Sequence, residues 1–192
     1  MKIIDMKIVV VGNPWKNWIF VKIFTDEGIE GLGECTGGLM TAPNEGSLKE
    51  LKSRIIGRDP TRVNELIDFV RKTLFLSRGG NALSGIEMAC WDIIGKTCGR
   101  PLYQLLGGKV REKIRVYANG WYQGPREPQA FAEKAAQMVE AGYTALKFDP
   151  FGKAYKFMSR EEEILSMDIV RAVRRTVGEQ VDLMIEAHDR FS

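Results

Sequence analysis

The sequence contains few of the residues on which disulfide scaffolds and zinc sites depend. Its 192 residues include one histidine and three cysteines, Cys35, Cys90 and Cys98, none of which has C-x-x-C spacing. An odd number of scattered cysteines predicts reduced thiols and argues against a disulfide framework. Asp5 interrupts the apolar start of the chain, which lacks a secretory profile, and no apolar run is long enough to span a bilayer. We therefore expect a cytoplasmic protein that is not inserted in a membrane.

The sequence also lacks a large excess of charge of either sign. Lysine and arginine number 28 against 25 aspartates and glutamates, which gives a formal charge of +3. Nucleic-acid-binding domains usually gather basic residues on one face, so we expect neither nucleic acid nor a membrane among the partners. Hydrophobic residues make up 44% of the chain, which is enough for a packed core and unlike a disordered segment.

Three antiparallel strands are predicted for the first third of the chain. The residues Asp-Glu-Gly at 26–28 are a tight-turn signal, because glycine tolerates the positive φ that hairpin turns often require. Gly31 and Gly33 lack the third glycine of a dinucleotide-binding motif, and we interpret them as sheet-packing positions. The predicted strands cover residues 3–11, 18–25 and 29–35, and a loop follows over residues 36–43.

Helices are predicted next, up to a domain boundary near residues 109–113. Ser47 with Glu50 three positions later has the capping-box pattern of a helix start. Apolar residues that recur with a period of 3.6 predict another helix after residues 59–61. Its predicted apolar face comprises Val63, Leu66, Ile67 and Val70, and a further helix over residues 81–96 and a short turn over 101–108 follow.

Beyond the boundary, strands alternate with helices. Each step from one predicted strand to the next is long enough for a crossover connection, so the sheet is expected to be parallel. In parallel sheets of this kind, functional groups lie beyond the carboxyl ends of the strands. The predicted strands cover residues 114–118, 144–148 and 181–187, and the predicted helices cover 127–141 and 161–177.

Four polar residues follow the ends of two of these strands. Residues two apart share one face of a strand, so Lys147 and Asp149 point the same way, as do Glu186 and His188. On adjacent parallel strands these groups converge. The imidazole of the only histidine is suited to proton transfer near neutral pH, and a glutamate offers the hard oxygen that Mg²⁺ prefers. The spacing leaves open a purely structural network, with Lys147 paired to Asp149 or to Glu186.

One segment resembles a known family. Residues 82–96, followed by 101–107, resemble the signature of the mandelate racemase/muconate lactonising group of the enolase superfamily, with Cys90 as a mild departure. The small residues of this signature let its helix pack closely at the domain junction. Residues 21–34 also look like the capping domain of that family.

The resemblance implies an architecture and a chemistry. The fold would be an α+β capping domain over residues 1–110, followed over 111–192 by the first three strands of a modified TIM (β/α) barrel that is incomplete. Family members bind Mg²⁺ through three acidic residues on successive barrel strands, abstract the proton α to a carboxylate, and stabilise the resulting enediolate on the metal. The full-length protein would be a homo-oligomer.

The resemblance also assigns roles to individual residues. Lys147 matches the first lysine of the Lys-x-Lys motif of the family, whereas Asp149 replaces the second. Glu186 occupies the place of the first metal ligand, and His188 resembles the general acid of sugar-acid dehydratases such as galactonate dehydratase. Lys147, Asp149 and His188 are thus the predicted catalytic residues, with Glu186 as the metal ligand. The predicted substrate-binding residues are Trp15, Asn119 and Trp121, although core packing explains the two tryptophans equally well.

The resulting hypothesis is Mg²⁺-dependent dehydration of an aldonic acid to a 2-keto-3-deoxy acid. The other two metal ligands and the catalytic base would lie beyond Ser192 or on a second chain. Two alternatives stay open: an acid-sugar epimerase or racemase on the same fold, and a non-catalytic truncated homologue that serves as an interaction module.

Overall fold

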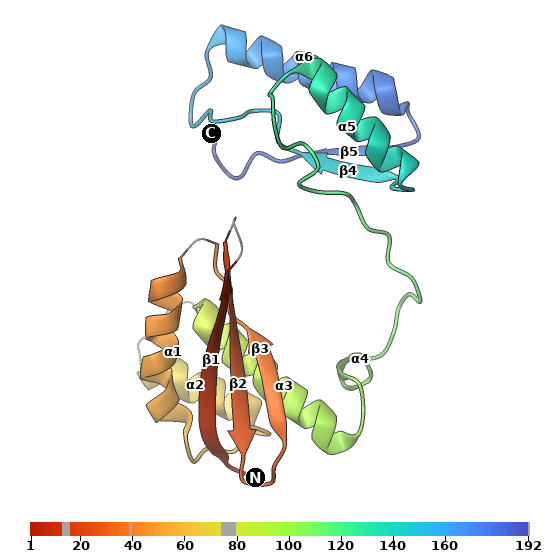
Figure 1. The fold of residues 1–192 in the computed structure, drawn as a ribbon. Helices are drawn as coiled ribbons and strands as arrows, with labels where there is room; N and C mark the ends of the chain where they lie inside the picture. Colours follow the sequence, from red (N-terminus) through yellow and green to blue (C-terminus); the bar gives the residue numbers. More distant parts are fainter. Residues whose placement is uncertain (13–15, 39, 74–79, 192) are drawn as a thin grey trace. The chain divides into compact units, whose positions relative to one another are not determined.

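The computed structural model describes residues 1–12, 16–38, 40–73 and 80–191. The chain folds as two compact units, Met1–Val110 and Arg111–Ser192, each with a hydrophobic core of its own. Figure 1 traces the elements of both units along the chain.

The first unit is an antiparallel sheet with helices packed on one face (Figure 1). Ile19, Val21 and Ile23 alternate along the central strand and are fully buried, since successive side chains of a strand point to opposite faces. The predicted strands of this part are confirmed. The elements are β1 (Ile3–Gly12), β2 (Asn17–Thr25), β3 (Glu30–Glu34), α1 (Thr41–Ile55), α2 (Val63–Thr73), α3 (Asn81–Cys98) and α4 (Leu102–Leu105).

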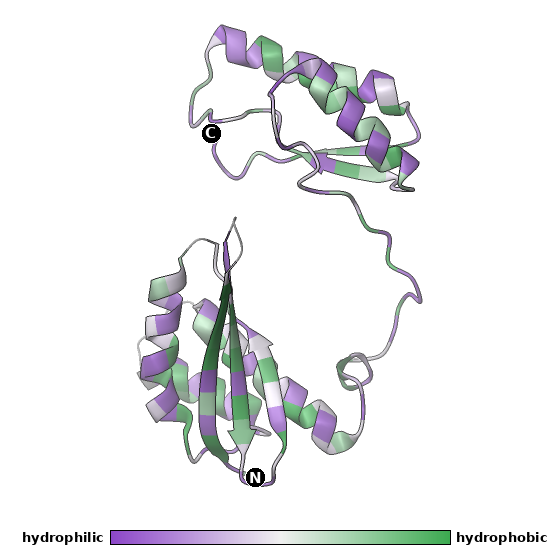
Figure 2. Ribbon diagram, in the orientation of Figure 1, coloured by the Kyte–Doolittle hydropathy of each residue, from purple (hydrophilic) through white to green (hydrophobic). Residues whose placement is uncertain are grey.

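Hydropathy follows this layering. In Figure 2, β1 and β2 carry long hydrophobic stretches interrupted by hydrophilic residues. The apolar face predicted for the helix after residue 61 is confirmed, because all four of its residues are buried in the core of the first unit. These residues are Val63, Leu66, Ile67 and Val70.

The glycines of β3 allow an unusually close approach of α3. A Cβ on Gly33 would lie 1.9 Å from the backbone oxygen of Gly85, and a Cβ on Gly31 would lie 2.0 Å from the backbone oxygen of Ala89. The sheet-packing interpretation of the two glycines is therefore confirmed. Gly85 and Ala89 of α3 thus pack against β3 within the first unit, and the packing of this helix at the domain junction stays a prediction.

The capping box predicted at Ser47 is wrong. Helix α1 begins at Thr41, so Ser47 lies inside it, and its hydroxyl donates to the backbone oxygen of Pro43 at 2.9 Å. Pro43 is compatible with the first turn because the amides there have no intrahelical acceptor. A true capping box lies at the start of α6 (Arg160–Val177), where Ser159 and Glu162 bond reciprocally.

The three cysteines differ sharply in accessibility. Cys35 and Cys90 are buried, and burial raises the pKa of Cys35 to about 11 and that of Cys90 to about 12. The thiolate is the reactive form, so neither thiol should react in the folded protein near neutral pH. Cys98 is exposed at the end of α3.

Alkylation with iodoacetamide should therefore modify Cys98 alone in the native protein and all three cysteines after unfolding. Peptide mass spectrometry identifies the modified residues, and Cys98→Ser serves as the control that removes native labelling. Rapid native modification of Cys35 or Cys90 would contradict the burial of these two thiols.

The second unit has two parallel strands covered by two helices (Figure 1). Leu146 and Phe148 of β4 are fully buried beneath Ile169 and Val173 of α6. The expectation of parallel pairing is confirmed by the register, in which Ala145 pairs with Asp182 and Phe148 with Ile185. The elements are α5 (Pro128–Glu140), β4 (Ala145–Phe148), α6 (Arg160–Val177) and β5 (Asp182–Ile185).

The strand predicted over residues 114–118 is wrong. Only Ala118 pairs, in an isolated parallel bridge to Leu146, with hydrogen bonds of 2.9 Å to Ala145 and 2.8 Å from Lys147. Ile114 and Val116 are 80% and 62% exposed, so the segment does not bury the apolar side chains that suggested a strand.

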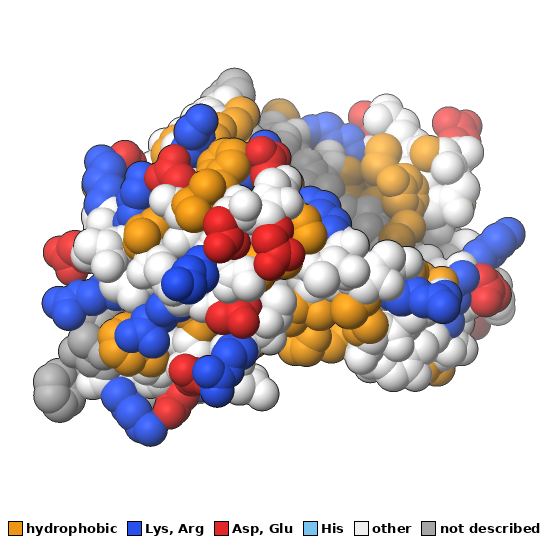
Figure 3. Space-filling model, turned by 90° about the horizontal axis from the view of Figure 1, so that it is seen from below, with side chains coloured by type: hydrophobic (Ala, Val, Ile, Leu, Met, Phe, Trp, Pro, Cys, Tyr) orange, Lys and Arg blue, Asp and Glu red, His pale blue; other side chains and the backbone are white. Residues whose placement is uncertain are grey.

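The near balance of basic and acidic residues in the sequence is also seen on the surface. On the face drawn in Figure 3, acidic and basic side chains lie interspersed among hydrophobic and neutral ones. Among the helices of the described residues, none is long and apolar enough to cross a membrane.

Candidate active site

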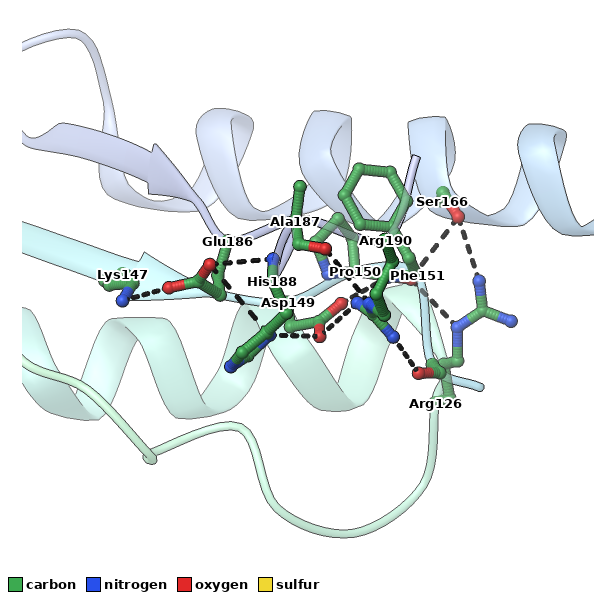
Figure 4. A network of polar contacts seen from close by, with 11 residues as sticks. Arg126, Lys147, Asp149, Pro150, Phe151, Ser166, Glu186, Ala187, His188 and Arg190 are labelled. Carbon is green, nitrogen blue, oxygen red and sulfur yellow. Dashed lines mark hydrogen bonds and ion pairs between the residues drawn. The ribbon is translucent and has the colours of Figure 1, made fainter. Parts of the chain in front are cut away.

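The polar residues predicted at the strand ends lie together at one edge of the second unit (Figure 4). Lys147 is in β4, and Asp149 follows that strand directly. Glu186 and His188 follow β5. Because β4 and β5 run in parallel, their carboxyl ends bring all four side chains to the same place, as the alternation argument predicted.

Lys147 and Glu186 form an ion pair at this edge. Both side chains are about one quarter exposed. The hydrogen bond from Lys147, and next that from the His188 backbone N–H, lower the pKa of Glu186 to about 2. The same contact with Glu186 raises the pKa of Lys147. At neutral pH the site therefore holds an ionised carboxylate beside a cation.

The His188 imidazole stands beside this pair and faces solvent. Its side chain is 59% exposed, and its Nδ1 lies 3.3 Å from Oδ2 of Asp149 and 3.9 Å from Oε1 of Glu186. The His188 backbone N–H donates to Oε1 of Glu186 at 2.8 Å. An exposed imidazole next to an ionised carboxylate can exchange protons with a bound molecule.

Asp149 forms an ion pair with Arg190, while Lys147 pairs with Glu186. Arg190 Nη2 donates to Oδ2 of Asp149 at 2.5 Å, and the backbone N–H of Phe151 donates to Oδ1 at 2.9 Å. Of the structural pairings left open by the sequence, the one between Lys147 and Glu186 is thus observed.

Two residues near the site were not predicted. Arg190 follows His188 by two positions, so the spacing that linked Glu186 to His188 could have included it. Tyr122 packs on Phe131 with ring centroids 5.9 Å apart. Burial, and next the charge of Asp149, raise the pKa of the Tyr122 hydroxyl. No sequence spacing connects Tyr122 to the strand ends, because it lies in a loop before α5.

The predicted substrate-binding residues lie in three different settings. Trp121 packs into the core of the second unit, with its ring 5.4 Å from that of Phe148, and its buried indole Nε1 has no hydrogen-bond partner among the described residues. Asn119 is exposed, and its Oδ1 accepts from the Gly120 backbone N–H at 2.9 Å. Trp15 lies outside the described residues.

Glu186 fits one place in a magnesium site. Mg²⁺ prefers oxygen ligands in octahedral geometry and is commonly bound through one or two carboxylates with water and substrate oxygens. An ionised carboxylate at a strand end has the right chemistry. The described part of the chain contains no group of three or more histidine, cysteine, aspartate or glutamate residues that could hold a metal. Glu186 therefore has the chemistry of one ligand in such a site.

Comparison with known families assigns both units. Residues 5–107 match the family described as "Mandelate racemase / muconate lactonizing enzyme, N-terminal domain", and residues 130–192 match "Enolase C-terminal domain-like".

Individual relatives agree with this assignment. The chain is 43% identical over 183 residues to D-gluconate dehydratase of Thermoproteus tenax, and 38% identical over 187 residues to D-gluconate/D-galactonate dehydratase of Picrophilus torridus. These alignments cover 93% and 94% of this chain but only 37% and 47% of the relatives. The crystal structure of an enolase-superfamily member from Salmonella Typhimurium is 34% identical, with a TM-score of 0.89, and the match covers 99% of this chain and 55% of that one.

The chain thus spans about half the length, or less, of these relatives and has the fold of a capping domain followed by the start of a barrel. The chain belongs to the mandelate racemase/muconate lactonizing enzyme family of the enolase superfamily.

Proposed function

We propose that the protein at its natural length dehydrates an aldonic acid to a 2-keto-3-deoxy acid. The main support for the proposal is the exposed imidazole of His188, whose Nδ1 lies 3.3 Å from Oδ2 of Asp149. The backbone N–H of the same residue donates to the ionised carboxylate of Glu186. The names of the relatives, D-gluconate dehydratase and D-gluconate/D-galactonate dehydratase, support the same reaction and the same class of substrate.

The reaction requires the loss of one proton and one hydroxyl from neighbouring carbons. A base takes the proton α to the carboxylate, and the electron pair of that C–H bond becomes the new C=C bond as the C3–O bond breaks. His188 protonates the departing hydroxyl, which leaves as water. The enol then tautomerises to the 2-keto acid. Lys147 contributes positive charge near the substrate carboxylate.

Glu186 would hold Mg²⁺ as one of its ligands, and the metal when bound supplies positive charge against the substrate carboxylate.

Asp149 favours dehydration over two-base racemisation. Racemisation with a lysine base would use a second lysine at this position, and the carboxylate present there is bonded to Arg190. The Asp149 oxygens thus already accept hydrogen bonds from Arg190 and from the Phe151 backbone N–H.

The experiment is a substrate panel with the natural-length protein and Mg²⁺. D-Gluconate, D-galactonate and D-xylonate are incubated separately, and 2-keto acid formation is followed together with the configuration at C2. Formation of a 2-keto-3-deoxy acid from at least one aldonate is expected. Inversion at C2 without loss of water would instead establish the epimerase, and absence of both reactions would favour the non-catalytic module.

A further inference from the structure

We propose that Asp149 and Arg190 are positioning residues that hold the His188 imidazole for proton donation, an inference that rests on the proposed function. Hydrogen bonds and an ion pair of these two side chains connect the loop after β5 to the loop after β4 (Figure 4). The sequence had suggested a catalytic role for Asp149, whereas its contacts assign it an action through His188.

The turn that carries His188 has an unfavourable backbone conformation. His188 has a φ of 51° and Asp189 a φ of 53°, which places two consecutive side-chain-bearing residues in the left-handed region. Residues other than glycine are uncommon in this region and persist where surrounding contacts hold them. The turn therefore needs hydrogen bonds from neighbouring side chains to present the imidazole in one orientation.

Arg190 provides these hydrogen bonds. Its Nε donates to the backbone oxygen of Ala187 at 3.0 Å, across the turn, and its Nη1 donates to the backbone oxygen of Gly152 at 2.9 Å, in the other loop. The backbone N–H of Lys156 donates to the backbone oxygen of Arg190 at 2.9 Å. The Arg190 side chain is only 17% exposed, and a planar guanidinium with several donors is suited to joining fixed acceptors in this way.

The Asp149 carboxylate lies beside the imidazole ring. Its Oδ2 accepts from Arg190 at 2.5 Å and lies 3.3 Å from Nδ1 of His188, while its Oδ1 accepts from the Phe151 backbone N–H. The carboxylate is 13% exposed, and its oxygens are committed to protein donors. A proton on Nδ1 of His188 faces Asp149, which leaves Nε2 as the nitrogen directed to a substrate hydroxyl.

The inference predicts a selective defect. Arg190→Met removes the hydrogen bonds of the guanidinium, and Asp149→Asn keeps the side-chain shape but removes the charge that pairs with Arg190. Each should lower kcat for dehydration by about 10- to 100-fold, because small displacements of a catalytic group are that costly. KM for the aldonate and the rate at which the α-proton exchanges with solvent should stay close to wild type, since neither depends on His188. Arg171→Met is the matched control, because Arg171 pairs with Asp168 on the exposed surface of α6.

Dehydration and exchange are measured separately in D₂O by NMR, with thermal unfolding to establish that each variant folds. Asp149→Asn is the milder change and keeps the test valid if Arg190→Met does not fold. Parallel losses of exchange and dehydration, or wild-type dehydration in both variants, would overturn the positioning role. A wild-type protein that dehydrates no aldonate would overturn the proposed function itself, which is a separate and earlier observation.

Discussion

Substituting His188 by asparagine is expected to lower sugar-acid dehydration by about 10²- to 10⁴-fold, the usual contribution of a general acid. Asparagine tolerates the left-handed backbone of residue 188 better than most residues, so the turn should keep its shape. The variant loses the proton donor and keeps Lys147 and Glu186. Exchange of the α-proton with solvent should therefore continue.

The measurement compares product formation with deuterium incorporation at C2 for wild type and His188→Asn. Arg171→Met again serves as the control, with both rates expected to match wild type. Product formation by His188→Asn at the wild-type rate would show that another group protonates the leaving hydroxyl.

Introducing alanine at Gly33 is expected to lower the free energy of unfolding by at least about 3 kcal/mol, at the upper end of the usual cost of overpacking. The new Cβ would lie 1.9 Å from the backbone oxygen of Gly85 and 3.0 Å from the backbone nitrogen of Ala89. Both contacts are with backbone atoms, so no change of rotamer relieves them. The sheet and α3 would have to move apart and open the core of the first unit.

Gly46→Ala is the matched control for this substitution. A Cβ at Gly46 meets no atom within 4 Å, and the residue lies inside α1. Alanine is favoured over glycine in helices, so this variant should be more stable by up to about 1 kcal/mol. Urea unfolding of both variants tests the pair. Equal stability of Gly33→Ala and wild type would contradict the close packing of β3 on α3.

The fold could be predicted from sequence where a local signal determined it. The turn signal at residues 26–28 separated β2 from β3, and the 3.6-residue period identified α2. Such a signal failed at residues 114–118, because β-rich composition does not reveal whether a neighbouring strand pairs with the whole segment. It also failed at Ser47, because a capping-box motif is equally compatible with a helix interior.

The candidate site could likewise be predicted in part. Period-two spacing after two parallel strands placed Lys147, Asp149, Glu186 and His188 together. The pairings among them depend on side-chain reach and loop shape, which spacing does not encode. Arg190 continues the same two-residue spacing after His188, but nothing in the spacing shows that its side chain joins the two loops.

Substrate contacts and assembly remain predictions. Asn119 and Trp121 lie on the segment that leads into α5, and Trp121 packs into the core of the second unit. A homo-oligomeric natural-length protein is expected from the family resemblance alone.

If the Glu186–His188 strand end belongs to a sugar-acid dehydratase, the natural-length protein should convert an aldonate in the presence of Mg²⁺. The most direct test is a ¹H NMR time course of that protein with Mg²⁺ and D-gluconate or D-galactonate in D₂O. The C2 proton signal is expected to disappear and a partly deuterated C3 methylene signal to grow as the 2-keto-3-deoxy acid forms. Unchanged C2 and C3 signals for both sugar acids would contradict this expectation.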